Sequence, residues 1–352
     1  MFAEKLLIWY SENGRSLPWR GIDNPYFIWL SEIILQQTRI EQGRSYYEHF
    51  TREYPTVRHL AEATEQQVLK SWQGLGYYSR ARNLHKAAQK VAYELDGRFP
   101  GTYEGILSLP GVGRYTAAAV ASFAFKLPYP VIDGNVYRVV ARLYGLYTPI
   151  GTDAAYKEFE GLLNHLIDRQ HPDLFNQAIM DFGSIYCKPA GPDCLNCIFR
   201  QECVAYREGK VEQLPVRMKR AEVKRRYFYY FDIRWHEMDK EFLLVRRRGE
   251  GDVWQGLYDF PLWEVEAPVK AASQRKRFPA LLKEWMGVAP QRMETGPMLQ
   301  HQLTHRTIVA QFVRVDYMRR PPQIPPQAEV IETPELKYLP VSRLMDRYLH
   351  EL

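Results

Sequence analysis

The stretch LPGVGRYTAAA, residues 109–119, decides how the first part of the chain is expected to fold. The segment just before it, YEGILSL, has the pattern of a short helix, and an alanine-rich helical pattern follows. Gly111 and Gly113 allow a tight backbone turn and a close approach of the backbone to a partner. Amides at the start of the second helix can bind a phosphate. The stretch therefore predicts two helices joined by a glycine-rich hairpin that is suited to contact an anion.

Composition sets the broad class of the chain. It has 352 residues, of which 46% are hydrophobic and 25% charged, which indicates a globular protein of two domains or one large one. The net charge of +6 favours an anionic partner such as nucleic acid, although many basic proteins have no such partner. The N-terminus lacks the pattern of a secretory signal, and no run of 18 apolar residues occurs. We expect a cytoplasmic protein that does not span a membrane.

The character of the sequence changes once along the chain. Residues 1–213 show apolar positions at helical spacing, joined by short Gly/Pro loops. Residues 214–226 carry six Lys/Arg and one Glu, which predicts a basic linker or a solvated connector without a partner. From residue 227 to 352 the segments YFYYFDIRW and EFLLVRRRG predict strands on either side of a turn at Met238-Asp239.

All four cysteines lie between residues 187 and 203, with the spacing C-x6-C-x2-C-x5-C. A disulfide scaffold would spread its cysteines along a short secreted chain, so this grouping predicts a metal site. Four thiolates can hold a tetrahedral zinc ion or an iron–sulfur cluster, and the donor set alone leaves both open. The candidate ligands are Cys187, Cys194, Cys197 and Cys203.

A glutamate lies inside the apolar run WLSEIILQQTR, residues 29–39, which follows a plausible helix start at Asn24-Pro25. Three of the four helical neighbours of Glu32 are apolar. Burial among them would hold the carboxyl group protonated toward neutral pH, as a general acid requires. The alternative is a partly exposed glutamate that pairs with Arg39 or with a base that is distant in the sequence.

A second carboxylate precedes a helical pattern in VIDGNVYRVVARLYG, residues 131–145. Asp133 is suited to cap that helix, which is a common use of aspartate. The helix N-terminus would also keep the carboxylate ionised. A capping role and a catalytic role can therefore coexist in this residue.

These motifs, together with LPWR and GLGYYSRARNLHKAA, resemble the adenine DNA glycosylase (MutY) family of the endonuclease III superfamily of helix-hairpin-helix glycosylases. The resemblance covers nearly all of residues 1–205, and the cysteine spacing matches that superfamily's cluster loop. It implies a multidomain α plus α/β fold. The all-helical glycosylase region (1–213) would contain the cluster loop (187–203) with one [4Fe-4S] cluster, and a Nudix-like α/β domain (227–352) would follow.

The resemblance also implies a function. The family hydrolyses the N-glycosidic bond of adenine mispaired with 8-oxoguanine or guanine in duplex DNA, as a step of base excision repair. Glu32 would protonate the adenine, Asp133 would stabilise the charged sugar, and Tyr115 and Asn135 would orient these groups and the water. Endonuclease III has a lysine where this chain has Tyr115, so the chain should be a monofunctional glycosylase that forms no Schiff base. DNA and base contacts are expected from Arg20, Gln37, Tyr77, Gly111, Gly113, Gln177, Thr304 and His305. We expect a monomer, associated with the nucleoid if the source is bacterial.

The C-terminal region departs from the family's pattern in two places. WQGLYDFP, residues 254–261, resembles the segment before a Nudix box, but no pair of glutamates follows to bind magnesium. Nucleotide hydrolysis is therefore not expected. The family's Phe-Ser-His lesion-reading loop has its nearest match in Leu303-Thr304-His305, without the aromatic residue. Thr304 and His305 could instead be a strand-end pair that binds nothing.

Two rival functions follow from the same motifs. A thymine- or pyrimidine-specific relative of the superfamily can also carry tyrosine at the position of Tyr115. Glu32 and the C-terminal domain argue against this, because pyrimidine excision needs no protonation at N7. A non-catalytic iron–sulfur DNA-binding protein is disfavoured by the presence of both Glu32 and Asp133.

Overall fold

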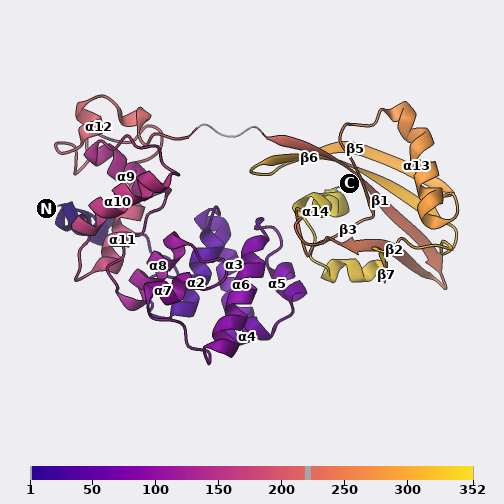
Figure 1. Cartoon of the computed structure of the whole chain (residues 1–352), viewed down its shortest axis with the longest axis horizontal. Helices are drawn as coiled ribbons and strands as arrows, with labels where there is room; N and C mark the ends of the chain where they lie inside the picture. The colour runs from indigo at the N-terminus through magenta and orange to yellow at the C-terminus, as the bar shows by residue number, and fades with distance from the viewer. Residues whose placement is uncertain (1, 219–222, 352) are drawn as a thin grey trace. The chain divides into compact units, whose positions relative to one another are not determined.

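The computed structural model describes residues 2–218 and 223–351. Residues 219–222, which belong to the predicted basic linker, lie outside the described residues. The chain forms two compact units, one of Met1–Glu62 and Asn83–Arg220 and the other of Ala63–Arg82 and Ala221–Leu352. Figure 1 shows the helices of the N-terminal part in indigo to magenta and the strands of the C-terminal part in orange.

The first unit is helical, as the apolar spacing predicted. Asn24 caps α2 by accepting hydrogen bonds from the backbone N–H groups of Tyr26 (3.0 Å) and Phe27 (3.4 Å), and Pro25 occupies the first turn, where its missing N–H costs nothing. The α-helices of this unit are α1 (Phe2–Asn13), α2 (Pro25–Leu35), α3 (Ile40–Glu53), α4 (Val57–Glu62), α6 (Ser79–Gln89, whose first residues belong to the second unit), α7 (Tyr103–Leu107), α8 (Arg114–Phe125), α9 (Gly134–Tyr144), α10 (Asp153–Leu166), α11 (Pro172–Asp181) and α12 (Val204–Arg207). Shorter helical segments are η1 (Lys90–Glu94), η2 (Phe182–Tyr186) and η3 (Val211–Gln213).

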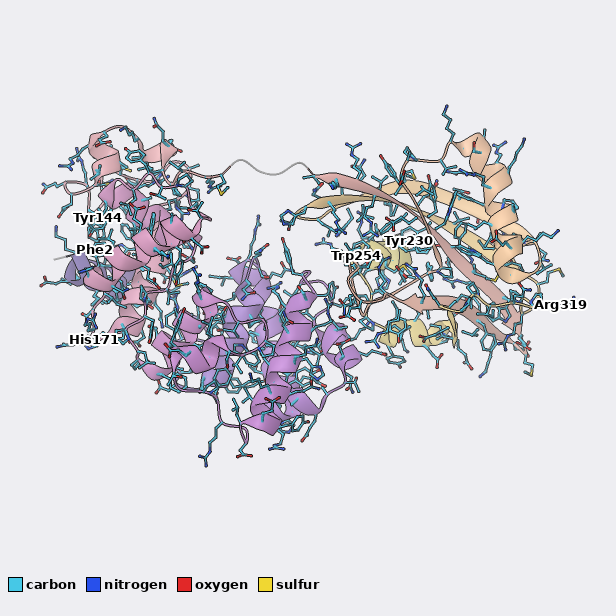
Figure 2. The ribbon with its side chains drawn as sticks, in the orientation of Figure 1. Phe2, Tyr144, His171, Tyr230, Trp254 and Arg319 are labelled. Carbon is cyan, nitrogen blue, oxygen red and sulfur yellow. The ribbon has the colours of Figure 1, made fainter. Side chains whose placement is uncertain are left out.

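In one hydrophobic core of this unit, the N-terminal helix α1 packs with the later helices α9, α10 and α11. Leu6 of α1, Val140 of α9, Phe159 of α10 and Phe175 of α11 are fully buried in the same cluster. Phe2 extends this contact at the surface, where its ring lies 6.2 Å from that of Tyr144 in an edge-to-face arrangement (Figure 2). The segment before Asp133 and the helix after it are thus anchored in the core.

The hairpin between α7 and α8 uses its two glycines differently. Gly111 has φ +73°, and a Cβ atom there would lie 2.4 Å from the Cβ of Asn83. Only glycine fits such a position without strain. Gly113 has φ −98° and caps α8, so the turn itself does not require glycine there. A Cβ at Gly113 would meet nothing within 4 Å, which leaves the start of α8 open to a partner.

The second unit is an α/β structure around a mixed sheet. Its elements are α5 (Glu65–Ser71), β1 (Lys224–Glu237), β2 (Lys240–Arg247), β3 (Tyr258–Asp259), β4 (Leu262–Val265), α13 (Ala271–Met286), β5 (Arg292–Gln302), β6 (Arg306–Tyr317), β7 (Glu329–Glu332), η4 (Thr333–Tyr338) and α14 (Arg343–Glu351). The strand order is β3-β2-β1-β6-β5, with β4 paired to β1 and β7 to β2. The β1–β6 pair is parallel and the other pairs are antiparallel.

The predicted turn is confirmed, and the sheet is buried on both faces. Met238 and Asp239 have φ 48° and 61°, the left-handed pair that suits a two-residue hairpin. Tyr230 of β1 packs in a cluster with Leu344 of α14 (Figure 2), whereas its neighbour Tyr229 packs in a second cluster with Phe278 of α13. Alternate residues of a strand point to opposite faces, so one helix covers each face of the sheet. β1 begins at Lys224, inside the segment predicted as a linker.

No helix in the described part of the chain is long and apolar enough to cross a membrane.

Candidate active site

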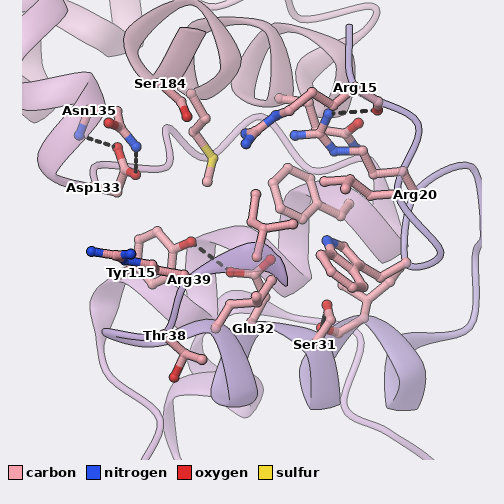
Figure 3. A pocket seen from close by; sticks show the side chains of 18 of the residues that line it. Arg15, Arg20, Ser31, Glu32, Thr38, Arg39, Tyr115, Asp133, Asn135 and Ser184 are labelled. Atoms are coloured by element: carbon pink, nitrogen blue, oxygen red, sulfur yellow. Dashed lines mark hydrogen bonds between the residues drawn. The ribbon is translucent and has the colours of Figure 1, made fainter. Parts of the chain in front are cut away.

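A pocket in the first unit brings together Glu32, Tyr115, Asp133 and Asn135 from three helices (Figure 3). Glu32 lies on α2 and is only 6% exposed, because the apolar residues around it on this helix are themselves buried. The hydroxyl group of Tyr115, in the first turn of α8, donates a hydrogen bond of 2.7 Å to Oε2 of Glu32. The alternative of a partly exposed Glu32 is therefore wrong. Arg39 lines the same pocket.

The electrostatics of the pocket suit a proton donor. Burial raises the pKa of Glu32 to about 7, and the negative charge of Asp133 acts in the same direction. The hydrogen bond from Tyr115 and the positive charge of Arg20 oppose this rise in pKa. A carboxyl group with a pKa near neutrality is half protonated at the pH where an enzyme works, which is the condition for general acid catalysis.

Asp133 caps α9, as its position in the sequence predicted. Its Oδ1 accepts hydrogen bonds of 2.8 Å from the backbone N–H groups of Asn135 and Val136, and its Oδ2 accepts one of 2.8 Å from the Asn135 side chain. Burial nevertheless raises the pKa of Asp133, whereas these hydrogen bonds and Arg138 act to lower it. Removal from water thus outweighs the helix terminus in its effect on the pKa of Asp133.

Asn135 connects the aspartate to the cysteine segment. Its Oδ1 accepts a hydrogen bond of 2.8 Å from Arg138, whose Nε donates to the backbone carbonyl of Cys187 at 2.8 Å. Arg138 also donates to the carbonyl of Gly183 at 2.6 Å. A guanidinium group has five donors in a rigid fork, so one side chain holds α9 and the start of the cysteine loop together.

Arg20 and Gln177 also line the pocket, and each is held there by a partner that the sequence did not reveal. Arg20 donates hydrogen bonds of 2.7 and 2.8 Å to the carboxylate of Asp181, which is fully buried. Arg15 donates to the same carboxylate, and these bonds keep the pKa of Asp181 below its usual value despite burial. Gln177 accepts a hydrogen bond of 2.9 Å from Tyr10. Asp181 is an isolated acid in an apolar helix pattern, and no sequence signal pairs it with two distant arginines.

The four cysteines line one cavity, although they come from separate turns of the loop. Arg142 of α9 donates hydrogen bonds to the carbonyl groups of Lys188 (2.7 Å) and Pro189 (3.0 Å), and its guanidinium group lies 3.5 Å from the Cys187 sulfur. Within the described residues, no three His, Cys, Asp or Glu side chains are grouped so that they could hold one metal ion.

Other predicted contact residues are exposed. Gln37 follows α2 with φ 56° and lies outside the protein core. Within the second unit, the hydroxyl of Tyr77 lies 2.8 Å from that of Thr304, and Tyr77 has φ 48°. Both residues line a pocket with His305 and with Trp254, which the sequence prediction did not include.

Comparisons with known proteins match both units. Residues 30–165 match the HhH-GPD superfamily of base excision DNA repair proteins, and residues 233–351 match the NUDIX domain. An adenine DNA glycosylase of Buchnera aphidicola (subspecies Acyrthosiphon pisum) is 33% identical over 262 residues, covering 74% of this chain and 74% of the relative. The human adenine DNA glycosylase is 40% identical over 222 residues, covering 60% of this chain and 41% of its own length.

Solved structures agree on the helical fold. A thermostable thymine-DNA glycosylase is 30% identical, with a TM-score of 0.55, over 59% of this chain and 95% of that one. Endonuclease III in a non-covalent DNA complex is 22% identical, with a TM-score of 0.52, over 59% of this chain and 94% of that one, and it supports the fold alone. The expected helix-hairpin-helix glycosylase fold followed by a Nudix-like domain is confirmed. The chain belongs to the adenine DNA glycosylase family, and it is a DNA glycosylase.

Proposed function

We propose that the chain excises adenine paired with 8-oxoguanine or guanine in duplex DNA, as a monomeric, monofunctional N-glycosylase. The observation that carries this proposal is Glu32, which is 6% exposed, bonded to Tyr115 and shifted in pKa to about 7. Adenine is a poor leaving group as an anion, so its departure requires a proton at N7. A pyrimidine offers no N7, and a buried neutral acid would be of little use against it.

The reaction begins when the adenine leaves the base stack, at a cost of a few kcal/mol. Gln37 is exposed and has a left-handed backbone conformation. We assign its side chain to the space that the extruded base vacates, because a planar amide can stack on bases. Arg20 and Gln177 line the pocket that would receive the base.

Bond cleavage then uses the two carboxyl groups in different states. Glu32 gives its proton to N7, the C1′–N9 bond breaks with its electron pair going to the base, and positive charge remains on the sugar. Asp133, as the carboxylate, stabilises that charge. Water adds at C1′ and loses a proton to the solvent, which leaves an abasic site. One protonated and one ionised carboxyl group is also the arrangement of glycoside hydrolysis.

Asn135 and Tyr115 hold the reacting groups. Asn135 donates to Asp133 through its side chain and its backbone, so it fixes the direction of the carboxylate. Tyr115 donates to Glu32 and leaves the other carboxyl oxygen of Glu32 to carry the proton. Neither side chain is an amine, so the abasic strand should remain intact until alkali is added.

The second unit is assigned to the base opposite the adenine. The hydroxyl groups of Tyr77 and Thr304 lie 2.8 Å apart at one pocket, which His305 also lines. A planar ring, a hydroxyl and an imidazole can stack on a purine and hydrogen-bond its edge. Leu303 stands where the family has an aromatic residue, and it supplies apolar contact without a ring.

We also propose that Cys187, Cys194, Cys197 and Cys203 hold one [4Fe-4S] cluster. The support is their shared cavity, the all-thiol donor set and the positive charge of Arg142 beside Cys187. The cluster would have a structural role, in which it keeps the loop after η2 in one conformation. The loop would lie on the DNA backbone together with the hairpin of Gly111 and Gly113, whose open helix start can bind a phosphate.

A three-substrate cleavage assay tests this function. Duplexes with adenine opposite 8-oxoguanine, adenine opposite guanine and thymine opposite guanine are incubated with the protein, and alkali then cleaves at abasic sites. We expect product from both adenine duplexes and none from the thymine duplex. Product from the thymine duplex alone would instead support a mismatch thymine glycosylase, and no product from any duplex would contradict a glycosylase of either kind.

A further inference from the structure

Asn176 of α11 is a buried side chain for which the proposed reaction has no use so far. It is 1% exposed, and its amide makes three hydrogen bonds. Nδ2 donates to the hydroxyl of Ser122 at 2.9 Å and to the carbonyl of Tyr129 at 2.9 Å, and Oδ1 accepts from the backbone N–H of Val131 at 3.0 Å. Both N–H donors and the carbonyl oxygen are thus used.

These three bonds join the two halves of the candidate active site. Ser122 lies on α8, the helix that carries Tyr115 and through it contacts Glu32. Tyr129 and Val131 belong to the segment that leads directly into Asp133, two residues after Val131. One side chain therefore ties the helix on the general-acid side of the pocket to the segment on the aspartate side.

Asp133 is oriented by its own helix but is not positioned by it alone. The cap at α9 sets the direction of the carboxylate relative to Asn135 and Val136. The distance from that carboxylate to Glu32 depends instead on how α9 and its preceding segment sit against α8. Asn176 bonds to both of these parts, and a displacement of about 1 Å at reacting groups can cost about a hundredfold in rate.

We propose that Asn176 is a positioning residue, which acts by fixing Asp133 relative to the Glu32–Tyr115 pair. This inference rests on the proposed function. It adds a residue that touches neither DNA nor base and that governs the rate of excision, not the strength of binding.

The expected effect is limited by a second support of the same segment. The ring of Tyr129 stacks on that of Tyr103 from α7, with the centroids 4.5 Å apart and an angle of 16° between the planes. This stack remains when the amide is removed, so the segment should shift and not detach. We therefore expect a loss of about ten- to a hundredfold in rate, smaller than the loss from removing a reacting group.

Single-turnover excision on the adenine:8-oxoguanine duplex tests the proposal in the full chain. Asn176→Ala removes all three bonds. Asn176→Asp keeps the shape and the acceptor for Val131 but removes the donor to the carbonyl of Tyr129. We expect the rate constant on bound duplex to fall about ten- to a hundredfold for the first variant and at least about fivefold for the second. The affinity for an uncleavable duplex should stay within about threefold of the wild-type value in both variants.

A matched control separates positioning from simple loss of stability. Leu60 of α4 is fully buried, and it lies outside the pocket and outside the core cluster that anchors the Asp133 segment. Leu60→Ala should lower the unfolding temperature and the fraction of active protein, while the rate constant of that fraction stays within about twofold of wild type. Ser122→Ala keeps Asn176 but removes its link to α8, and it should slow excision at least about threefold even if the Asn176 variants do not fold.

The outcomes separate the inference from the function on which it rests. Wild-type protein without activity on either adenine duplex would overturn the proposed function. A different result would overturn the positioning role alone. In that result the wild-type protein is active and Asp133→Asn loses excision, but the Asn176 variants that fold keep rate constants within about twofold of wild type. If neither Asn176 variant folds, an unchanged rate constant in Ser122→Ala would overturn that role. A loss of duplex affinity in the Asn176 variants that matches their loss of rate would also overturn the positioning role, because Asn176 would then be a binding residue.

Discussion

Tyr115 donates a hydrogen bond of 2.7 Å to Oε2 of Glu32, so the residue that we propose at the lysine position of a lyase contacts the residue that we propose as the general acid. The hydroxyl group belongs to α8 and the carboxyl group to α2, and the two residues are 83 positions apart in the sequence. This contact connects the two features that define the proposed chemistry, which are a proton donor with a pKa near 7 and the absence of an amine nucleophile at this position.

The missing amine predicts how the DNA product behaves. A lysine in this position would form a Schiff base with the sugar, and borohydride would trap it as a covalent complex. We expect no trapped complex with this chain and no strand cleavage before alkali is added. Tyr115→Lys serves as the comparison, since it restores an amine. Trapping of the wild-type chain at the level of a lysine-bearing relative would contradict the assignment.

The raised pKa of Glu32 also predicts that this residue lowers the stability of the folded protein at high pH, although it is needed for activity. Its folded pKa of about 7 exceeds the ordinary value of 4.5, so the folded state binds the proton more tightly than the unfolded state. The free energy of unfolding should therefore fall as pH rises from about 4.5 to about 7. Glu32→Gln cannot ionise and should be more stable than wild type at pH 8, by on the order of 3 kcal/mol from the size of the shift. Denaturant unfolding at pH 5 and pH 8 measures the free energy of unfolding of both proteins. Equal stability of the two proteins at pH 8 would show that burial does not destabilise the ionised form of Glu32.

The cysteine cavity predicts the metal content of the purified protein. A [4Fe-4S] cluster on four thiolates should give a yellow-brown protein with about four irons per chain. Cys197→Ser should lower the iron content and the unfolding temperature together, because the loop loses one of its attachments. Elemental analysis and absorbance provide the readout without any activity measurement. A colourless, active protein with one zinc per chain would contradict the cluster.

The pocket shared by Tyr77 and Thr304 predicts a change in preference, with excision itself retained. Thr304→Ala should reduce the preference for adenine opposite 8-oxoguanine over adenine opposite guanine by about 1 kcal/mol, the contribution of one typical hydrogen bond. Excision rates on the two duplexes, measured side by side, give this ratio. An unchanged ratio would assign lesion recognition to other residues.

A point substitution is also a better test than removal of the C-terminal region. Lys70 donates to the carbonyl of Leu339 at 3.0 Å, and Gln73 donates to Asp346 at 3.1 Å, both within the second unit. A chain that ends near Val211 would expose the residue 63–82 segment, so any loss of activity would mix lost recognition with lost structure.

Much of this architecture follows from local pattern. The apolar spacing predicts the helices, the aromatic and β-branched residues of YFYYFDIRW predict the long first strand, and Gly111 marks a turn that only glycine fits. Glu32 is predictable as buried because the residues beside it on α2 are apolar, and it is buried in the structure. These features depend on residues that are close in sequence.

The features that the sequence does not reveal depend on partners that are far apart along the chain. Asp181 binds Arg20 from 161 residues away, and Asn176 binds a backbone N–H from 45 residues away. A backbone group carries no residue signature, and a single polar residue in an apolar helix does not indicate its partner. The parallel pairing of β1 with β6 is hidden for the same reason.

The most direct test of the central claim is the single-turnover rate of Glu32→Gln on the adenine:8-oxoguanine duplex, measured with wild type between about pH 5.5 and 9. Wild-type excision should fall as pH rises through about 7, because Glu32 loses its proton there. Glu32→Gln should be at least about a hundredfold slower near pH 7, with duplex affinity retained and without the pH dependence. Excision by Glu32→Gln within a few-fold of wild type, with the same pH profile, would contradict the assignment of Glu32 as the acid.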